Sequence, residues 1–154
     1  MLKTLWIMRH GLAESEFDTD FNRALSAVGK SQAADVAEQL IKTEVELPDN
    51  MLVSPFRRTQ ETAQIVHQSL AIDKPFETED LLVHFADPHL LGDFLLAAKF
   101  EKLIVVSHMP IVARLCQYLS PDCEIYGFQT AQVVKIEFDK NGVGKVNHSY
   151  LPRV

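Results

Sequence analysis

Short apolar runs that alternate with helical periodicity restrict this chain to an α/β fold. Three or four apolar residues follow one another at 5–8, 51–53 and 103–106, and each run predicts a buried strand. Apolar residues recur at helical spacing in the ranges 33–41, 55–70, 90–98 and 112–119, with Ser26 as the expected N-cap of the first helix. Strands that alternate with helices favour a mainly parallel sheet with helices packed on it.

The C-terminal part of the chain has a different pattern. Val134, Ile136 and Phe138 alternate with polar residues, and Asn141-Gly142 predicts a hairpin into a last strand near 145–150. A short edge strand is expected at 75–77, and the polar segment 14–22 is expected to be a loop. We therefore expect one domain over residues 1–154, built as a three-layer α/β/α sandwich with an antiparallel C-terminal hairpin.

The net charge of −6 disfavours binding to nucleic acid or to an anionic membrane surface. The apolar N-terminal run meets Arg9 and His10 too soon to form a signal-peptide core or a membrane span. The spacing of Cys116 and Cys123 matches no zinc or redox motif, which favours two reduced thiols. We expect a cytoplasmic protein with no membrane or nucleic-acid partner, and a monomer.

Unusual residues follow each of the three predicted buried strands. Because ligands collect beyond the carboxyl ends of parallel strands, these segments are expected at one rim. A neutral histidine nitrogen can attack phosphorus, and arginine pairs well with the oxygens of a transferring phosphoryl group. Gly11 would let the backbone approach an oxyanion. The combination predicts metal-free and cofactor-free phosphoryl transfer, and its segments are Arg9-His10-Gly11, Ser54-Pro55-Phe56-Arg57-Arg58 and Ser107-His108.

These motifs resemble those of the histidine phosphatase superfamily, which has the phosphoglycerate mutase-like fold. Arg9-His10-Gly11 resembles the family's first-strand signature, and Ser107-His108-Met109-Pro110 resembles its second-histidine motif. Residues 54–63 are similar to its S-P-x-x-R-x-x-x-T helix start. Residues 23–29 are similar to its R-P-L-T-x-x-G segment, with Ala24 in place of proline.

The resemblance implies a role for each matching residue. His10 would be the nucleophile, and the residues that bind the phosphoryl group would be Arg9, Arg58 and His108. Arg23 would either reach the phosphate or anchor its loop. Arg57 does not match the motif and is expected at the helix surface or the rim of the site.

The closest likeness within the superfamily is to the compact bacterial phosphohistidine phosphatases. The interval 54–102 has room for little more than two helices and a short strand, which predicts an open site suited to a phosphorylated phosphorelay or phosphotransfer protein. An imidazole leaving group depends less on a general acid than an alkoxide does. If a proton donor exists, the candidates are Glu79, Asp80 and His84.

Three alternatives stay open. A small-molecule phosphomonoesterase of the same superfamily would be favoured by a carboxylate within reach of His10. A non-catalytic phosphoprotein-binding module is disfavoured by the intact nucleophile. His84 and His89 with Asp87 and Asp93 could form a metal cluster, although Asp87-Pro88 more plausibly starts a helix that has His89 in its first turn.

Overall fold

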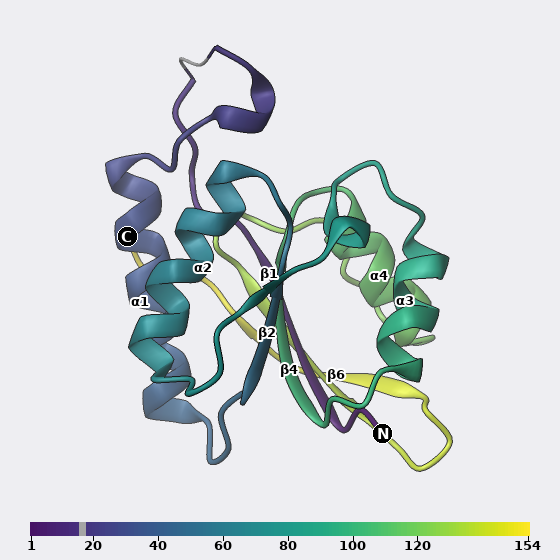
Figure 1. Cartoon of the computed structure of the whole chain (residues 1–154). Helices are drawn as coiled ribbons and strands as arrows, with labels where there is room; N and C mark the ends of the chain where they lie inside the picture. Colours follow the sequence, from purple (N-terminus) through teal and green to yellow (C-terminus); the bar gives the residue numbers. More distant parts are fainter. Residues whose placement is uncertain (16–17) are drawn as a thin grey trace.

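The computed structural model describes residues 1–15 and 18–154, and its centre is a six-stranded sheet (Figure 1). The strand order is β3-β2-β4-β1-β5-β6. β1 pairs in parallel with β4, and β2 pairs in parallel with β4 and β3, whereas β5 runs antiparallel to β1 and β6. The prediction of a mainly parallel sheet with an antiparallel hairpin is confirmed. The strands are β1 (Thr4–Arg9), β2 (Asn50–Val53), β3 (Glu77–Thr78), β4 (Lys102–Ser107), β5 (Val133–Phe138) and β6 (Gly144–Tyr150).

Helices cover both faces of the sheet, which gives the three layers visible in Figure 1. α1 (Ala27–Thr43) and α2 (Arg57–Leu70) pack on one face, and α3 (Pro88–Ala97) and α4 (Ile111–Leu119) pack on the other. The side chains of β1 alternate between the two cores: Trp6 and Met8 join the cluster under α1 and α2, while Leu5 and Ile7 join the one under α3 and α4. Each such buried side chain contributes about 1.5–3 kcal/mol of hydrophobic stabilisation.

Side-chain caps fix two of the helix starts that the sequence predicts. The hydroxyl oxygen of Ser26 accepts a hydrogen bond from the backbone N–H of Gly29 at 3.0 Å. The carboxylate of Asp87 accepts one from the N–H of His89 at 2.9 Å, and Pro88 occupies the first turn of α3. Each cap satisfies a backbone donor that the helix itself leaves unpaired. Asp87 and His89 are thereby explained by the start of a helix.

The structure adds detail where the sequence has no periodic pattern. The expected loop 14–22 ends in a short 3-10 helix, η1 (Asp20–Asn22), while the prediction for residues 16 and 17 lies outside the described residues. A second 3-10 helix, η2 (Asp80–Leu82), precedes α3. The predicted edge strand, β3, begins at Glu77 rather than at Pro75. Single turns like these are held by side-chain caps, so they leave no hydrophobic period in the sequence.

The predicted hairpin is present, but Asp139 organises its turn. The Asp139 carboxylate accepts hydrogen bonds from the backbone N–H groups of Asn141 at 2.8 Å and Val143 at 3.0 Å. Gly142 has a φ of 76°, a left-handed conformation that glycine adopts without strain. The turn is therefore longer than a two-residue Asn-Gly connection.

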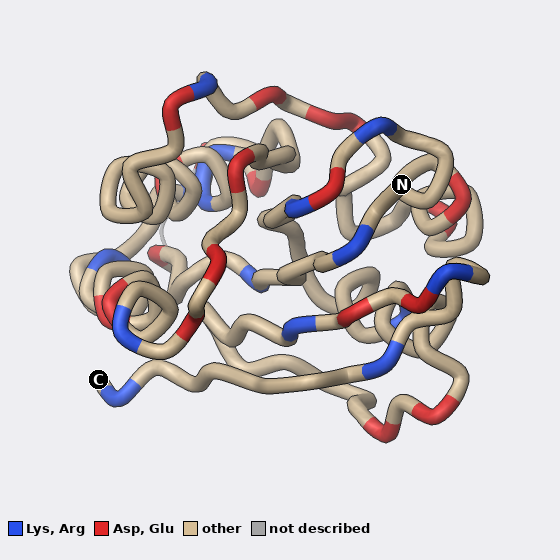
Figure 2. The backbone as a smooth tube through the Cα atoms, turned by 90° about the horizontal axis from the view of Figure 1, so that it is seen from below, with Lys and Arg blue, Asp and Glu red and all other residues tan. Residues whose placement is uncertain are grey.

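Charged residues of both signs are interspersed on the side of the molecule opposite the upper loops of Figure 1 (Figure 2). Among the helices of the described residues, none combines the length and apolar character that crossing a bilayer requires.

Candidate active site

The three strand ends singled out in the sequence meet at one edge of the sheet. His10 directly follows β1, His108 follows β4, and Ser54 follows β2. β4 lies between β1 and β2 and is parallel to both, so their carboxyl ends coincide. The ring centroids of His10 and His108 are 5.4 Å apart. The tertiary structure thus brings together side chains that are almost a hundred residues apart in the chain.

His10 is buried and held in one tautomer. Its Nδ1 lies 2.6 Å from the carbonyl oxygen of Gly11. Since a carbonyl can only accept, Nδ1 carries the proton and Nε2 keeps a free lone pair. Burial lowers the pKa of His10 to about 4; the bond to Gly11 opposes this shift, and the positive charge of Arg58 adds to it. At neutral pH the ring is therefore uncharged and nucleophilic at Nε2.

His108 is also kept neutral, by deeper burial. Burial lowers its pKa to about 2, and repulsion from protonated His10 and from Arg58 acts in the same direction. Its Nε2 forms a 2.7 Å hydrogen bond with the hydroxyl of Ser54, which is itself fully buried. The ring of Phe56 packs against the ring of His108 with a centroid distance of 5.0 Å. These contacts fix the His108 ring beside His10.

Two guanidinium groups complete the site, and backbone carbonyls orient both. Arg9 Nη1 donates to the carbonyl of Phe128 at 2.7 Å, and Arg58 Nη1 donates to the carbonyl of Asp20 at 2.9 Å. Arg58 Nη1 also lies 3.5 Å from the Asp20 carboxylate. Burial lowers the pKa of both arginines, yet a guanidinium remains charged at any physiological pH. The site therefore holds two fixed positive charges beside two neutral imidazoles.

Unpartnered buried nitrogen atoms concentrate in this region. Within residues 1–15 and 18–154, five buried side-chain polar atoms have no hydrogen-bond partner, and four of them belong to Arg9, Arg58, His84 and His108. Leaving such a group unsatisfied costs about 1–3 kcal/mol. An arginine Nε–H can only donate, so Arg9 and Arg58 each hold a buried donor without an acceptor beside the two histidines. The arrangement fits an oxyanion such as a phosphoryl group.

Gly11 serves close packing of the loop that follows β1. A Cβ atom added at Gly11 would lie 2.6 Å from the carbonyl oxygen of Gly29, at the start of α1. The N–H of Gly11 donates to the hydroxyl of Thr62 on α2 at 3.1 Å. That N–H donates within the protein and holds this loop on α2, and an approach of the Gly11 backbone to a bound oxyanion stays a prediction.

Hydrogen bonds of Arg23, one of them to Asp20, hold the loop before α1 in place. Arg23 Nε donates to the carbonyl of Glu14 at 3.0 Å, and its Nη1 donates to the Asp20 carboxylate at 3.3 Å. The positive charge of Arg23 also contributes to the lowered pKa of His10. Two roles were expected for Arg23, binding the phosphate or anchoring its loop. Its hydrogen bonds to Glu14 and Asp20 support the role of anchoring the loop. Sequence reasoning missed Asp20, because an acidic residue in a polar loop carries no motif.

Arg57 lies on the surface, as expected. Its Nη1 is 3.4 Å from the carbonyl of Asn22, and its Nε is 3.5 Å from the carboxylate of Glu61. The carboxylate of Glu61 also accepts a hydrogen bond from the N–H of Leu25 at 2.8 Å. Arg57 therefore braces the loop, and Arg58 is the member of the pair that turns toward the histidines.

The three candidate proton donors occupy different environments. The Glu79 carboxylate caps η2 by accepting from the N–H of Leu81 at 3.0 Å, and Asp80 is exposed. His84 joins the histidine cluster, with its ring 5.1 Å from that of His108. Burial, followed by the charge of Arg58, lowers the pKa of His84. It is thus neutral at neutral pH, which makes it a weak general acid.

The histidines of the postulated metal cluster lie in different surroundings. His89 stacks on Tyr118 with a centroid distance of 4.4 Å, while His84 packs against Phe56 and His108. No set of three or more histidine, cysteine or acidic side chains within the described residues is arranged to hold a metal ion.

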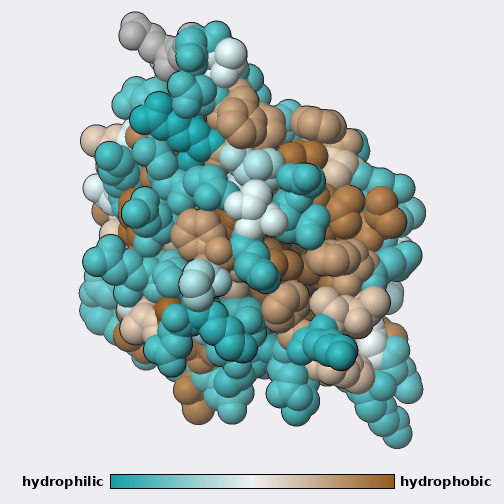
Figure 3. Space-filling view, in the orientation of Figure 1, coloured by the Kyte–Doolittle hydropathy of each residue, from teal (hydrophilic) through white to brown (hydrophobic). Residues whose placement is uncertain are grey.

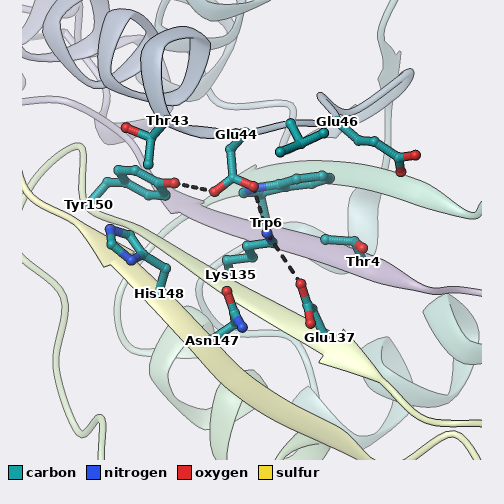
Figure 4. A pocket seen from close by; sticks show the side chains of 11 residues that line it. Thr4, Trp6, Thr43, Glu44, Glu46, Lys135, Glu137, Asn147, His148 and Tyr150 are labelled. Atoms are coloured by element: carbon teal, nitrogen blue, oxygen red, sulfur yellow. Dashed lines mark hydrogen bonds and ion pairs between the residues drawn. The ribbon is translucent and has the colours of Figure 1, made fainter.

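A separate cavity of about 440 Å³ lies beside the C-terminal end of α1, over β1, β5 and β6 (Figure 4). Its charged groups pair with one another: Lys135 Nζ is 2.6 Å from Glu44 and 3.3 Å from Glu137. The hydroxyl of Tyr150 donates to Glu44 as well. Because these charges satisfy each other, we assign this network a structural role in holding α1 on the sheet.

Comparison with known proteins identifies the family. The model of the histidine phosphatase superfamily (branch 1) matches residues 5–85, which is more than half of the chain. The chain is 30% identical over 151 residues to the phosphohistidine phosphatase SixA of Escherichia coli, covering 96% of this chain and 93% of that protein. It is 29% identical over 157 residues to the SixA homolog of Haemophilus influenzae, with 96% of each chain covered.

Solved structures agree with the sequence comparison. The structure of the protein histidine phosphatase SixA complexed with tungstate superimposes with a TM-score of 0.90 at 29% identity, covering 97% of both chains. The strand order, the three motifs at the strand ends and these similarities lead to one assignment: the chain belongs to the histidine phosphatase superfamily.

Proposed function

We propose that this protein is a phosphohistidine phosphatase that removes the phosphoryl group from a phosphorelay or phosphotransfer protein through a phosphorylated His10. As a member of the superfamily it is a phosphatase with a histidine nucleophile. The observation that carries the assignment of His10 is its fixed tautomer, with Nδ1 bound to Gly11 and Nε2 free. The proposal includes a cytoplasmic monomer that uses no metal or cofactor.

The residues of the site divide the reaction between them. His10 Nε2 attacks phosphorus and a new P–N bond forms. The P–N bond to the substrate imidazole, whose other ring nitrogen already carries a proton, breaks and releases that imidazole as a neutral molecule. Arg9, Arg58 and His108 stabilise the charge on the equatorial oxygens during transfer. Water then attacks phosphorylated His10, which releases inorganic phosphate and regenerates the neutral ring.

The proton donors favour phosphohistidine as the substrate. An imidazole needs only one proton, already acquired by the phosphoramidate, to leave as a neutral molecule, whereas an alkoxide needs an acid in the transition state. Glu79 is engaged in capping η2, and neutral His84 is a weak acid. The similar E. coli and H. influenzae proteins are phosphohistidine phosphatase SixA and its homolog, which supports the same substrate class.

A small-molecule phosphomonoesterase is the second candidate, and the position of His84 favours it. With its ring 5.1 Å from that of His108, His84 is the residue that could serve an ester leaving group. A bound phosphate dianion would raise the pKa of His84 and so increase the fraction of His84 that carries a proton to donate to such a group.

The decisive experiment compares kcat/KM for a phosphohistidine protein, a phosphoserine peptide and p-nitrophenyl phosphate. We expect the phosphohistidine protein to be preferred over phosphoserine by about 100-fold or more, in the range that one general acid contributes. With ³²P-labelled substrate, wild-type protein should carry acid-labile label, and His10→Ala should carry none and have no activity. His148→Ala, at an exposed histidine of β6, serves as the matched control. Equal efficiency on phosphoserine would refute the preference, and a labelled, active His10→Ala would refute the nucleophile.

A further inference from the structure

Four aromatic rings form a continuous row along the wall of the site. The row runs Phe21, Phe56, His84, Phe85, and the successive centroid distances are 5.0, 5.2 and 5.0 Å. Its two inner rings also contact His108, at 5.0 Å for Phe56 and 5.1 Å for His84. This aromatic row therefore reaches from the histidine cluster to the protein surface on both sides.

The two ends of the aromatic row are exposed, although its centre is not. Phe56 is only 8% exposed, whereas Phe21 is 51% and Phe85 is 74% exposed. Phe21 comes from η1 and Phe85 from the segment between η2 and α3. Figure 3 shows hydrophobic residues among hydrophilic ones in the upper part of the molecule, and Figure 1 shows η1 and the loop before α3 in that same part. Exposed aromatic rings grouped beside a polar site are typical of binding surfaces.

We propose that Phe21 and Phe85 form a docking surface for the phosphoprotein, seating apolar residues that flank its phosphohistidine. This inference rests on the proposed function. A protein that places a side-chain phosphoryl group at His10 must lay the surface around that side chain over the rim of the site. The arginines and histidines of the pocket can donate hydrogen bonds to the oxygens of the phosphoryl group. The exposed rings of Phe21 and Phe85 are instead complementary to apolar side chains.

The same geometry separates protein substrates from small ones. Phe21 and Phe85 each contact one of the inner rings that touch His108, so they border the reacting group without being part of its charge-stabilising set. A sugar phosphate or free phosphohistidine is too small to cover both ends of the aromatic row. The rings should therefore affect the binding of a protein and leave the chemical step unchanged.

The test uses Phe85→Ser, Phe21→Ser and the double variant in the full chain. Ile41→Ser is the matched control, because Ile41 is a 46% exposed apolar residue near the C-terminal end of α1. The N-terminal end of α1 is the one that packs beside the site, through Gly29 and Gly11. The substrates are a phosphorylated histidine-phosphotransfer domain and free phosphohistidine. We expect each single variant to raise KM for the phosphoprotein about fivefold and the double variant about twentyfold, as for truncated aromatic anchors. Activity on free phosphohistidine should change by less than about twofold.

The outcomes separate this inference from the proposed function. If wild-type protein prefers the phosphoprotein and the double variant hydrolyses it as well as the Ile41→Ser control does, the docking surface is refuted and the proposed function stands. An equal loss on both substrates would also refute it, since the rings would then support the chemical step. If the wild-type protein hydrolyses phosphoserine peptides as efficiently as the phosphoprotein, the proposed function fails, and the docking inference fails with it.

Discussion

Acid should destabilise this protein through His10 and His108, well above the pH at which carboxylates are protonated. Both rings have an ordinary pKa of 6.5, and burial lowers it to about 4 for His10 and about 2 for His108. Between pH 6.5 and 5 the unfolded chain therefore binds protons at both residues while the folded protein binds almost none. Stability is fully present above pH 6.5 and is lost as the pH falls, by up to about 1.4 kcal/mol per pH unit for each ring.

The magnitude follows from these values. At pH 5 each histidine should have removed about 2 kcal/mol of the free energy of unfolding relative to pH 7.5, or about 4 kcal/mol together. His108→Asn removes one of the two titrating rings, so that variant should lose only about 2 kcal/mol from these residues over the same interval.

Urea unfolding at both pH values measures the difference. Comparing the pH-induced loss within each protein cancels any baseline destabilisation by the substitution, and it also cancels the titration of groups that the two proteins share. The reasoning is wrong if wild type and His108→Asn lose the same free energy to within about 0.5 kcal/mol, because His108 would then take up its proton in the folded state.

Two further predictions concern the anion site and the structural network. Tungstate should inhibit competitively and raise Tm, as expected for an anion that binds the folded protein, and Arg58→Ala should abolish both effects; a Tm shift retained in that variant would place the anion elsewhere. The side chains of Glu44 and Lys135 are 5% and 14% exposed, and Lys135 keeps Glu137 as a partner, so Glu44→Gln should lower the free energy of unfolding by about 1–3 kcal/mol, measured in urea. Glu101→Gln, which removes an exposed partner of Lys3, should change it by less than about 0.5 kcal/mol; equal losses would contradict the structural role.

Much of the architecture could be predicted, because it depends on local periodicity. The alternation of buried runs with helical stripes predicted the three layers, and the alternation at Val134 to Phe138 predicted the antiparallel hairpin. Element ends were less predictable: β3 begins two residues later than expected, and the turn after β5 is organised by Asp139. Hydrogen bonds of single side chains decide those positions, and they leave no repeating pattern.

The sequence by itself determined which chemistry-bearing residues lie at the strand ends, since parallel strands place their carboxyl ends at one edge. Arg9, His10 and His108 follow directly from that rule and from their motifs. Only the tertiary structure decided which groups hold these side chains. Ser54 bonds to His108, and the carbonyl of Asp20 accepts from Arg58. The aromatic row extends from this cluster to Phe21 and Phe85. These contacts join loops far apart in the chain, and the conformation of a loop depends on what packs against it rather than on its own residues.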